Sequence, residues 1–182
     1  PEIDAVIGTG EVPEIVNLLG GSTPRRSHVP TVIPLLRADG EPLGPTDHKR
    51  ETEGLPTYIY DADTPRLLAT PQHYAYLKIA EGCDYKCAFC IIPTLRGHYR
   101  SRTAASIMQE AERLAVNGVK ELLLISQDTS FYGLDRGERG ALPRLLRALN
   151  TIDGLEWIRM LYLYPTTIGD DVLEAMAESE KV

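Results

Sequence analysis

Three cysteine residues carry the clearest chemical signal in this chain. They are its only cysteines and stand at Cys83, Cys87 and Cys90, in a Cys-x3-Cys-x2-Cys spacing that follows a strand-like segment. Thiolates are the soft ligands that iron-sulfur clusters require, and three of them fill three corners of a four-iron cluster. The spacing therefore favours a cluster with one iron left open for chemistry.

The same three positions also stand at helical spacing, so they could be buried thiols on one face of a helix. In a continuous helix, however, the first and last Cα atoms would lie ~10 Å apart along the axis at ~1.5 Å per residue. That is a long reach for thiolates that share one compact cluster, so ligation requires a loop. Gly82 and Asp84 flank Cys83, and Pro93 stops a helix that begins at Cys87.

Two other interpretations of the cysteines follow from their chemistry. A zinc site needs a fourth ligand, and His98, eight residues after Cys90, is the candidate. A disulfide framework fits poorly, because three is an odd number and the chain has no other feature of a small secreted scaffold. The spacing favours the cluster, with zinc and buried thiols as the alternatives.

The residues around the cysteines resemble a known family. The resemblance rests on Tyr-Ala-Tyr-Leu-Lys-Ile-Ala-Glu-Gly-Cys (74–83), Phe-Cys-Ile-Ile-Pro-Thr-Leu-Arg-Gly (89–97) and Arg-Ser-Arg (100–102), which are similar to the radical S-adenosylmethionine (SAM) methylthiotransferases. In that family three cysteines bind a 4Fe-4S cluster whose open iron chelates the amino and carboxylate groups of SAM. One-electron reduction then cleaves SAM to methionine and a 5'-deoxyadenosyl radical, which abstracts hydrogen from an unreactive carbon.

Composition indicates an ordinary soluble domain. With 182 residues, 43% of them hydrophobic and 25% charged, the chain can bury a core. It has no apolar run near ~18 residues and no signal peptide, so we expect a cytoplasmic protein without a membrane span. Because the chain opens on Pro1 and not on Met, we expect a fragment of a longer protein.

The charge balance bears on partners. A net charge of −7 speaks against a general nucleic-acid surface, which would be basic. A local basic group does surround the cysteines. Its members could face the SAM carboxylate, the cluster or an acidic substrate, or could equally be a solvated loop. They are Lys86, Arg96, His98, Arg100 and Arg102.

The first 72 residues divide into two segments. Residues 1–20 predict a strand at 5–7 and a helix at 12–19, and they resemble the end of the amino-terminal α/β domain of the methylthiotransferases. That domain carries a second 4Fe-4S cluster, whose cysteines are absent here. Residues 21–72 form a connector with eight of the thirteen prolines, in which only 57–60 predicts a strand.

Residues 73–182 predict alternating strands and helices. We expect strands at 76–80, 121–126 and 157–164, and helices at 103–116, 142–149 and 169–177. Thr103 is a good helix cap, and the apolar run 122–125 is typical of a parallel strand covered on both faces. Three strand-helix units in succession predict an α/β fold with a parallel sheet. The resemblance implies the first half of a partial (β/α) radical SAM barrel.

Ligands of parallel strand-helix folds bind at the carboxyl ends of the strands. The cysteine loop leaves the end of the first strand, residues 126–129 lie at the end of the second, and residues 162–164 lie at the end of the third. The resemblance implies that Gln127 and Asp128 hold the amino end of SAM and that Phe89 and Ile91 lie beside its adenine. Alternatively, Asp128 caps the following turn and Phe89 belongs to the core. We identify no catalytic side chain.

Within the family, the runs 70–74, 127–133 and 157–165 look like the RimO type. That branch is a transferase that methylthiolates the β-carbon of an aspartate on a small-subunit ribosomal protein, with electrons from a flavodoxin- or ferredoxin-like donor. The branch that modifies an isopentenylated adenosine of tRNA is the close alternative. A third possibility is an inactive fragment that binds the cluster alone.

Overall fold

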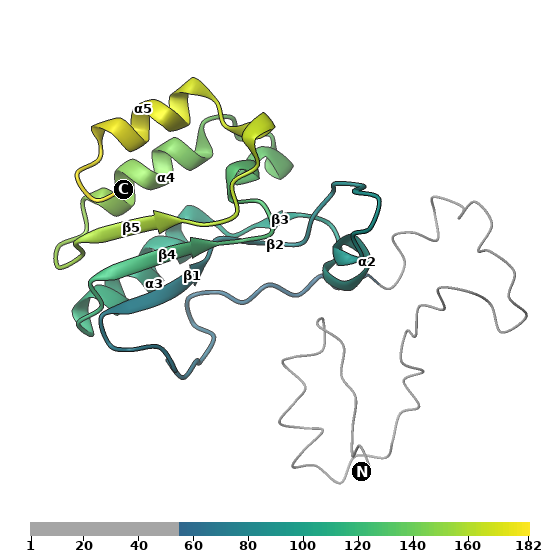
Figure 1. Ribbon diagram of the computed structural model, residues 1–182. Helices are drawn as coiled ribbons and strands as arrows, with labels where there is room; N and C mark the ends of the chain where they lie inside the picture. The colour runs from purple at the N-terminus through teal and green to yellow at the C-terminus, as the bar shows by residue number, and fades with distance from the viewer. Residues whose placement is uncertain (1–54) are drawn as a thin grey trace, which may run out of the picture. The chain divides into compact units, whose positions relative to one another are not determined.

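The computed structural model describes residues 55–182 (Figure 1). They belong to two compact units, which are considered separately. The larger unit consists of Ile59–Asp84 and Tyr99–Val182, and the described part of the smaller unit consists of residues 55–58 and Tyr85–His98. The elements predicted at 5–7 and 12–19 lie outside the described residues. Residues 21–54 of the proline-rich connector lie outside them as well.

A three-stranded parallel sheet forms the centre of the larger unit. Its strands are β1 (Tyr74–Lys78), β4 (Glu121–Ile125) and β5 (Trp157–Met160), in the order β1-β4-β5. Leu123 of β4 stands opposite Tyr76 of β1. The parallel pairing confirms the predicted α/β fold, because strands that run the same way need a crossover between them.

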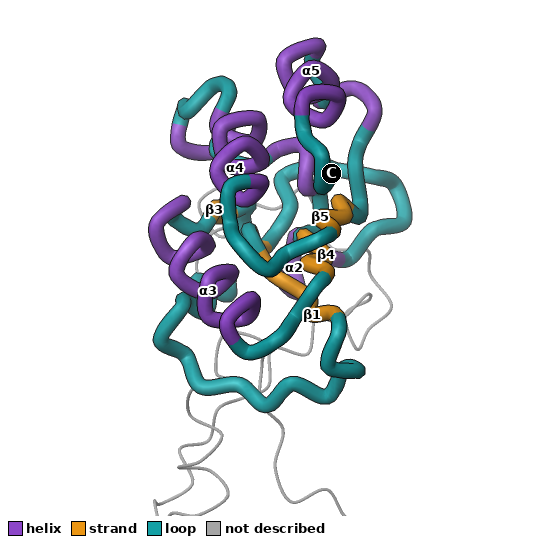
Figure 2. Tube along the Cα trace, turned by 90° about the vertical axis from the view of Figure 1, so that its left-hand side faces the viewer, coloured by secondary structure: helices purple, strands orange, loops and turns teal. Residues whose placement is uncertain are grey.

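Each strand of this sheet is followed along the chain by a helix. These helices are α3 (Ala104–Val116), α4 (Ala141–Asn150) and α5 (Asp170–Glu178). Thr103 caps α3 as predicted, since its hydroxyl accepts a hydrogen bond of 3.3 Å from the backbone N–H of Ser106. Figure 2 shows α3 and α4 on the same side of the strands.

The core lies between the sheet and these helices. The strands contribute one alternate set of side chains, and each helix contributes its apolar stripe. The fully buried members include Ala75, Leu77, Leu122, Leu124, Ile107, Ala111, Leu146, Leu149 and Ala175. None of the helices in the described residues is long and apolar enough to span a membrane.

The opposite face of the sheet is more open than predicted. Leu122 and Leu124 are fully buried, but Leu123 and Ile125 are only half-buried, and Tyr76 beside them is exposed. Within residues 55–182, the prediction that the apolar run is covered on both faces is therefore wrong. The run itself identifies a strand, whereas cover on the second face requires another layer that the described residues do not supply.

Two predicted strands differ from the structure near their ends. The first is Tyr74–Lys78, and the chain then forms β2 (Ala80–Glu81), which pairs antiparallel with β3 (Arg100–Ser101). The third ends at Met160, and Tyr162 has a φ of 60°, which is incompatible with a strand. Its predicted extension to residue 164 is wrong.

The strand predicted at residues 57–60 does not form. Tyr60 instead lies with its ring centroid 5.2 Å from the Arg102 guanidinium and 5.7 Å from the Lys78 ammonium. A β-branched and aromatic run forms a strand only where a neighbouring strand offers its backbone for pairing. Residues 59–72 belong to the same compact unit as the sheet.

Candidate functional site

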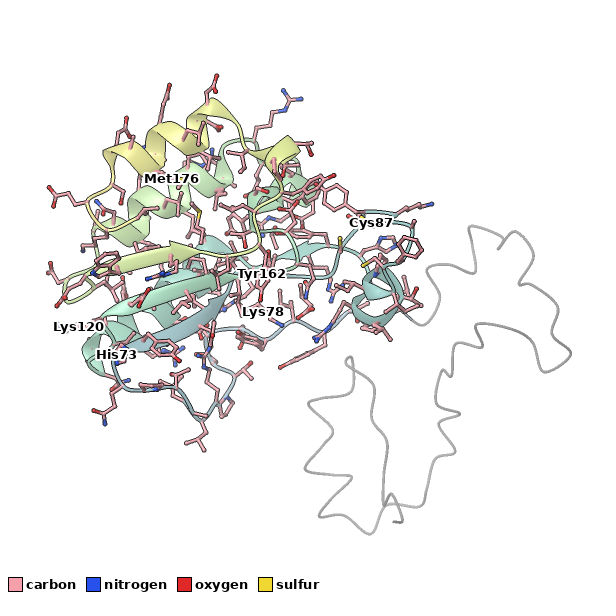
Figure 3. All side chains as sticks on the ribbon, in the orientation of Figure 1. His73, Lys78, Cys87, Lys120, Tyr162 and Met176 are labelled. Carbon is pink, nitrogen blue, oxygen red and sulfur yellow. The ribbon has the colours of Figure 1, made fainter. Side chains whose placement is uncertain are left out.

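The carboxyl ends of β4 and β5 are joined by hydrogen bonds. The Thr129 hydroxyl donates to the Leu161 carbonyl at 2.6 Å, and its backbone N–H donates to the Tyr162 carbonyl at 2.9 Å. The backbone N–H of Tyr164 donates to the Ser130 hydroxyl at 3.0 Å. Lys78 and Tyr162 lie at this end of the sheet, and His73 and Lys120 lie at the other (Figure 3).

The carboxyl ends of β1 and β4 also meet. The Gln127 side chain accepts a hydrogen bond of 2.8 Å from the Gly82 N–H and donates one of 3.1 Å to the Glu81 carboxylate. Glu81 is buried and pairs with the Lys78 ammonium. The sheet thus brings the start of the cysteine loop together with the end of the second parallel strand, as its topology predicts.

The three cysteines form no disulfide and lie on irregular backbone. No helix covers residues 82–90. Cys83 is 8% exposed, whereas Cys87 and Cys90 are exposed. The Cys90 N–H donates to the Cys87 carbonyl at 3.1 Å, which closes a turn between them. These observations contradict the alternative of three buried thiols on one helix face, because the segment is not helical and two of the three cysteines are exposed.

Helix α2 (Ile92–Arg96) follows this turn and has Pro93 in its first turn. Proline is favoured there because the first helical N–H groups have no intrahelical partner. Pro93 therefore begins a helix in addition to preventing one at Cys87. Phe89 is fully exposed and Ile91 is exposed, so the core alternative for Phe89 is wrong within the described residues.

The donor set fits a cluster by its chemistry, since three cysteines on a loop, none of them in a disulfide, supply the soft ligands that iron-sulfur clusters take. Among residues 55–182, no three His, Cys, Asp or Glu side chains form a ready group of metal ligands. The thiols Cys83, Cys87 and Cys90 would hold the cluster. His98 is exposed, and its zinc alternative stays a prediction.

Asp128 is used as a cap. Its side chain is 2% exposed, and one carboxylate oxygen accepts a hydrogen bond of 3.0 Å from the Ser130 N–H. It also accepts from the Ser130 hydroxyl, and it begins the short 3-10 turn Thr129–Phe131. The capping alternative is thus observed. Contact of Asp128 or Gln127 with SAM stays a prediction.

Tyr99 is a buried residue at this edge that the sequence did not single out. Its hydroxyl donates to the Asp128 carbonyl at 2.7 Å, and its ring meets Phe131 edge-on at 5.0 Å between centroids. Burial raises the pKa of Tyr99 well above its usual range, because the phenolate would lose its hydration. The burial of Tyr99 is visible only in the tertiary structure, because Tyr99 is not part of a helical or alternating pattern of apolar residues in the sequence.

Arg102 belongs to a buried ion-pair network and not to a solvated loop. It is 3% exposed, and its guanidinium donates to the Glu110 carboxylate at 2.6 Å and to the Lys78 carbonyl at 2.8 Å. The other oxygen of Glu110 accepts from Arg66 at 2.7 Å. Arg102, which directly follows β3, therefore links β3 to Lys78 at the end of β1. Arg100 is half-buried, and this burial lowers its pKa.

Parallel strands followed by a loop with three cysteines agree with the family to which this chain is similar. The family profile of the Radical SAM superfamily matches residues 77–182, which is more than half of the chain. The chain belongs to the radical SAM superfamily. In this superfamily member, the matched region begins inside β1 and contains all three cysteines.

Curated relatives match the whole chain. Proteins named ribosomal protein uS12 methylthiotransferase RimO are 42% identical in Koribacter versatilis, 42% in Desulfitobacterium hafniense and 44% in Pelotomaculum thermopropionicum. The chain spans 40%, 36% and 36% of these relatives, respectively. One solved structure in the comparison is the radical SAM methyltransferase TsrM from Kitasatospora setae, with tryptophan and a SAM analogue bound. It is 21% identical to this chain, with a TM-score of 0.48. The match covers 62% of this chain and 23% of TsrM.

Proposed function

We propose that this chain is part of a radical SAM methylthiotransferase that modifies ribosomal protein uS12. In this proposal the enzyme uses a 4Fe-4S cluster and SAM to place a methylthio group on the β-carbon of an aspartate. The observation that carries the proposal is the Cys-x3-Cys-x2-Cys sequence that follows the first strand of a parallel sheet, in a chain similar along its whole length to proteins named RimO.

Each part of the described site has a role in this proposal. Cys83, Cys87 and Cys90 hold three irons, and when bound the reduced cluster supplies the electron that cleaves SAM. Exposed Cys87 and Cys90 can be reached by iron, while buried Cys83 is held by its surroundings. Phe89, Ile91, Gln127 and Asp128 stay the proposed SAM contacts.

The partners are proposals as well. A ribosomal protein substrate agrees with the names of the relatives, and a negatively charged chain suits a basic partner. The enzyme would act in the cytoplasm, where ribosomes are, with a flavodoxin- or ferredoxin-like electron donor. A second cluster is proposed for sequence outside this chain.

The first experiment is anaerobic iron-sulfur reconstitution of the natural polypeptide that contains this chain. Electron paramagnetic resonance of the reduced protein is recorded with and without SAM. We expect a four-iron signal that changes when SAM binds, because the fourth iron has no protein thiolate. Incubation with uS12, SAM, a sulfur source and reductant should then add a methylthio group to one aspartate, as detected by peptide mass spectrometry.

Three single variants provide the controls: Cys83→Ala, Cys87→Ala and Cys90→Ala. Each should lose the four-iron species, and survival of a full cluster in any of them contradicts the ligand assignment. A colourless protein with stoichiometric zinc would support the zinc alternative. Modification of tRNA in place of uS12 would identify the other branch, and a cluster that never responds to SAM would indicate a binding module.

A further inference from the structure

A continuous chain of polar groups lies directly before the first cysteine. Lys78, the last residue of β1, pairs with one oxygen of Glu81. The other oxygen of Glu81 accepts a hydrogen bond of 3.1 Å from the Gln127 amide nitrogen. The amide oxygen of Gln127 accepts from the Gly82 N–H at 2.8 Å. The chain of contacts thus ends on the peptide next to Cys83.

The chemistry of the partners sets the orientation of the Gln127 amide. An ionised carboxylate only accepts hydrogen bonds, so the NH2 group must face Glu81 and the oxygen must face the backbone N–H of Gly82. A reversed amide would place two acceptors together and two donors together. The Lys78 ammonium occupies one oxygen of the buried Glu81 carboxylate, and the Gln127 NH2 group donates to the other, which leaves the amide oxygen facing Gly82.

Gly82 needs this external restraint. Its φ is +88°, a region that glycine enters freely and that other residues avoid. Glycine has no side chain whose packing could fix its peptide planes. The hydrogen bond from its N–H to Gln127 therefore restricts the backbone immediately before Cys83, a residue that is 8% exposed.

We propose that Gln127 is a positioning residue for the first cluster ligand, and that it acts on Cys83 through Gly82. The inference rests on the proposed cluster, because Cys83 is one of its three ligands. Groups that orient metal ligands without touching the metal usually contribute strongly to metal retention. In this arrangement Gln127, two residues after the end of β4, restrains the peptide before Cys83 across 45 residues of sequence.

The first test needs no cluster. In the apo protein, alkylation of Cys83 is followed by mass spectrometry in the parent and in Gln127→Met, which keeps the length of the side chain but removes its hydrogen bonds. We expect Cys83 to be alkylated at least about tenfold faster in the variant, equal to about 1.4 kcal/mol. Gln109→Met, on the exposed side of α3, is the matched control and should leave the rate unchanged.

The second test uses the reconstituted protein. Gln127→Met should lose iron to a chelator about 10–100-fold faster than the parent, and its reduced four-iron signal should differ before SAM is added. The double variant Glu81→Gln with Gln127→Glu exchanges the two groups and can restore both hydrogen bonds. It should recover most of the iron retention, whereas Gln127→Glu alone brings two carboxylates together and should not.

These outcomes separate the inference from the proposed function. An unchanged Cys83 alkylation rate in Gln127→Met overturns the positioning role, whether or not a cluster forms. An unaltered cluster with weakened SAM binding overturns it too, because Gln127 would then act on SAM alone and not on the cluster ligand. A parent protein that takes up no four-iron cluster refutes the proposed function, and the alkylation rates still decide how Cys83 is held.

Discussion

Arg102 is the residue whose removal should destabilise this fold most clearly. Its guanidinium is almost fully buried and donates to the Glu110 carboxylate at 2.6 Å, to the Ser106 hydroxyl at 2.9 Å and to the Lys78 carbonyl at 2.8 Å. The variant Arg102→Met keeps an unbranched side chain of similar length. It removes the charge and leaves these acceptors without their donor.

The magnitude follows from what remains after the substitution. Breaking a buried ion pair from one side costs about 3–5 kcal/mol, because the remaining charge stays buried. Here Glu110 keeps a second cation, Arg66, at 2.7 Å, so the loss should lie near the lower limit of about 3 kcal/mol. For a domain with a stability of about 5–15 kcal/mol, this is a large fraction.

Urea unfolding followed by circular dichroism measures this loss. With a slope of about 2 kcal/mol per M, the midpoint should fall by about 1.5 M. The matched control is Arg147→Met, which removes the exposed pair of Arg147 with Glu178 at 2.9 Å and should cost at most about 1 kcal/mol.

A double-mutant cycle with Glu110→Gln then isolates the pair itself. The double variant should be less destabilised than the sum of the two single variants. In the double variant, neither Arg102 nor Glu110 remains as a buried charge without the other. The reasoning is refuted if Arg102→Met costs less than about 1 kcal/mol, or if it costs no more than Arg147→Met.

Two further predictions concern tyrosines at the carboxyl edge. Tyr99 has a raised pKa because of burial, so the unfolded chain releases this proton near the ordinary value of 10.0 while the folded chain retains it. The free energy of unfolding should therefore fall as pH rises above about 10, and Tyr99→Phe should make this fall shallower in urea titrations from pH 8 to 11; an equal slope would contradict the assignment. Tyr162 has a φ of 60°, which costs a non-glycine residue about 1–2 kcal/mol. Tyr162→Gly should therefore be equally stable or up to about 1 kcal/mol more stable, whereas Tyr164→Gly, with an ordinary φ of −101°, should be less stable, and a loss of stability in both would exclude strain at Tyr162.

Much of the secondary structure could be predicted from local sequence. Thr103 caps α3 as predicted, because a cap acts through the backbone groups next to it, whereas helix α2, with Pro93 in its first turn, was not predicted. The loop character of the cysteine segment is equally local, since Gly82 adopts a positive φ that other residues avoid. The strand at residues 57–60 was wrong because strand formation depends on a partner that local sequence does not specify.

The candidate site was predictable only in part. The cysteine spacing and the strand order indicate which chain segments meet, because parallel strands present their carboxyl ends at one edge. The individual contacts are different. Nothing near Arg102 in sequence indicates that it is buried against Glu110, and nothing near Gln127 indicates that it binds the Gly82 N–H.

The sequence by itself determined the set of candidate thiolate ligands, the alternation of strands and helices, and the superfamily to which the chain is similar. These depend on side-chain identity and on periods of two and 3.6 residues, which are present in any short stretch of chain. The tertiary structure alone decided which face of the sheet is covered, which arginine is buried, and that Asp128 caps a turn while Gln127 reaches the cysteine loop. Such contacts join residues tens of positions apart, and they exist only once the register of β1, β4 and β5 brings those residues within hydrogen-bond distance.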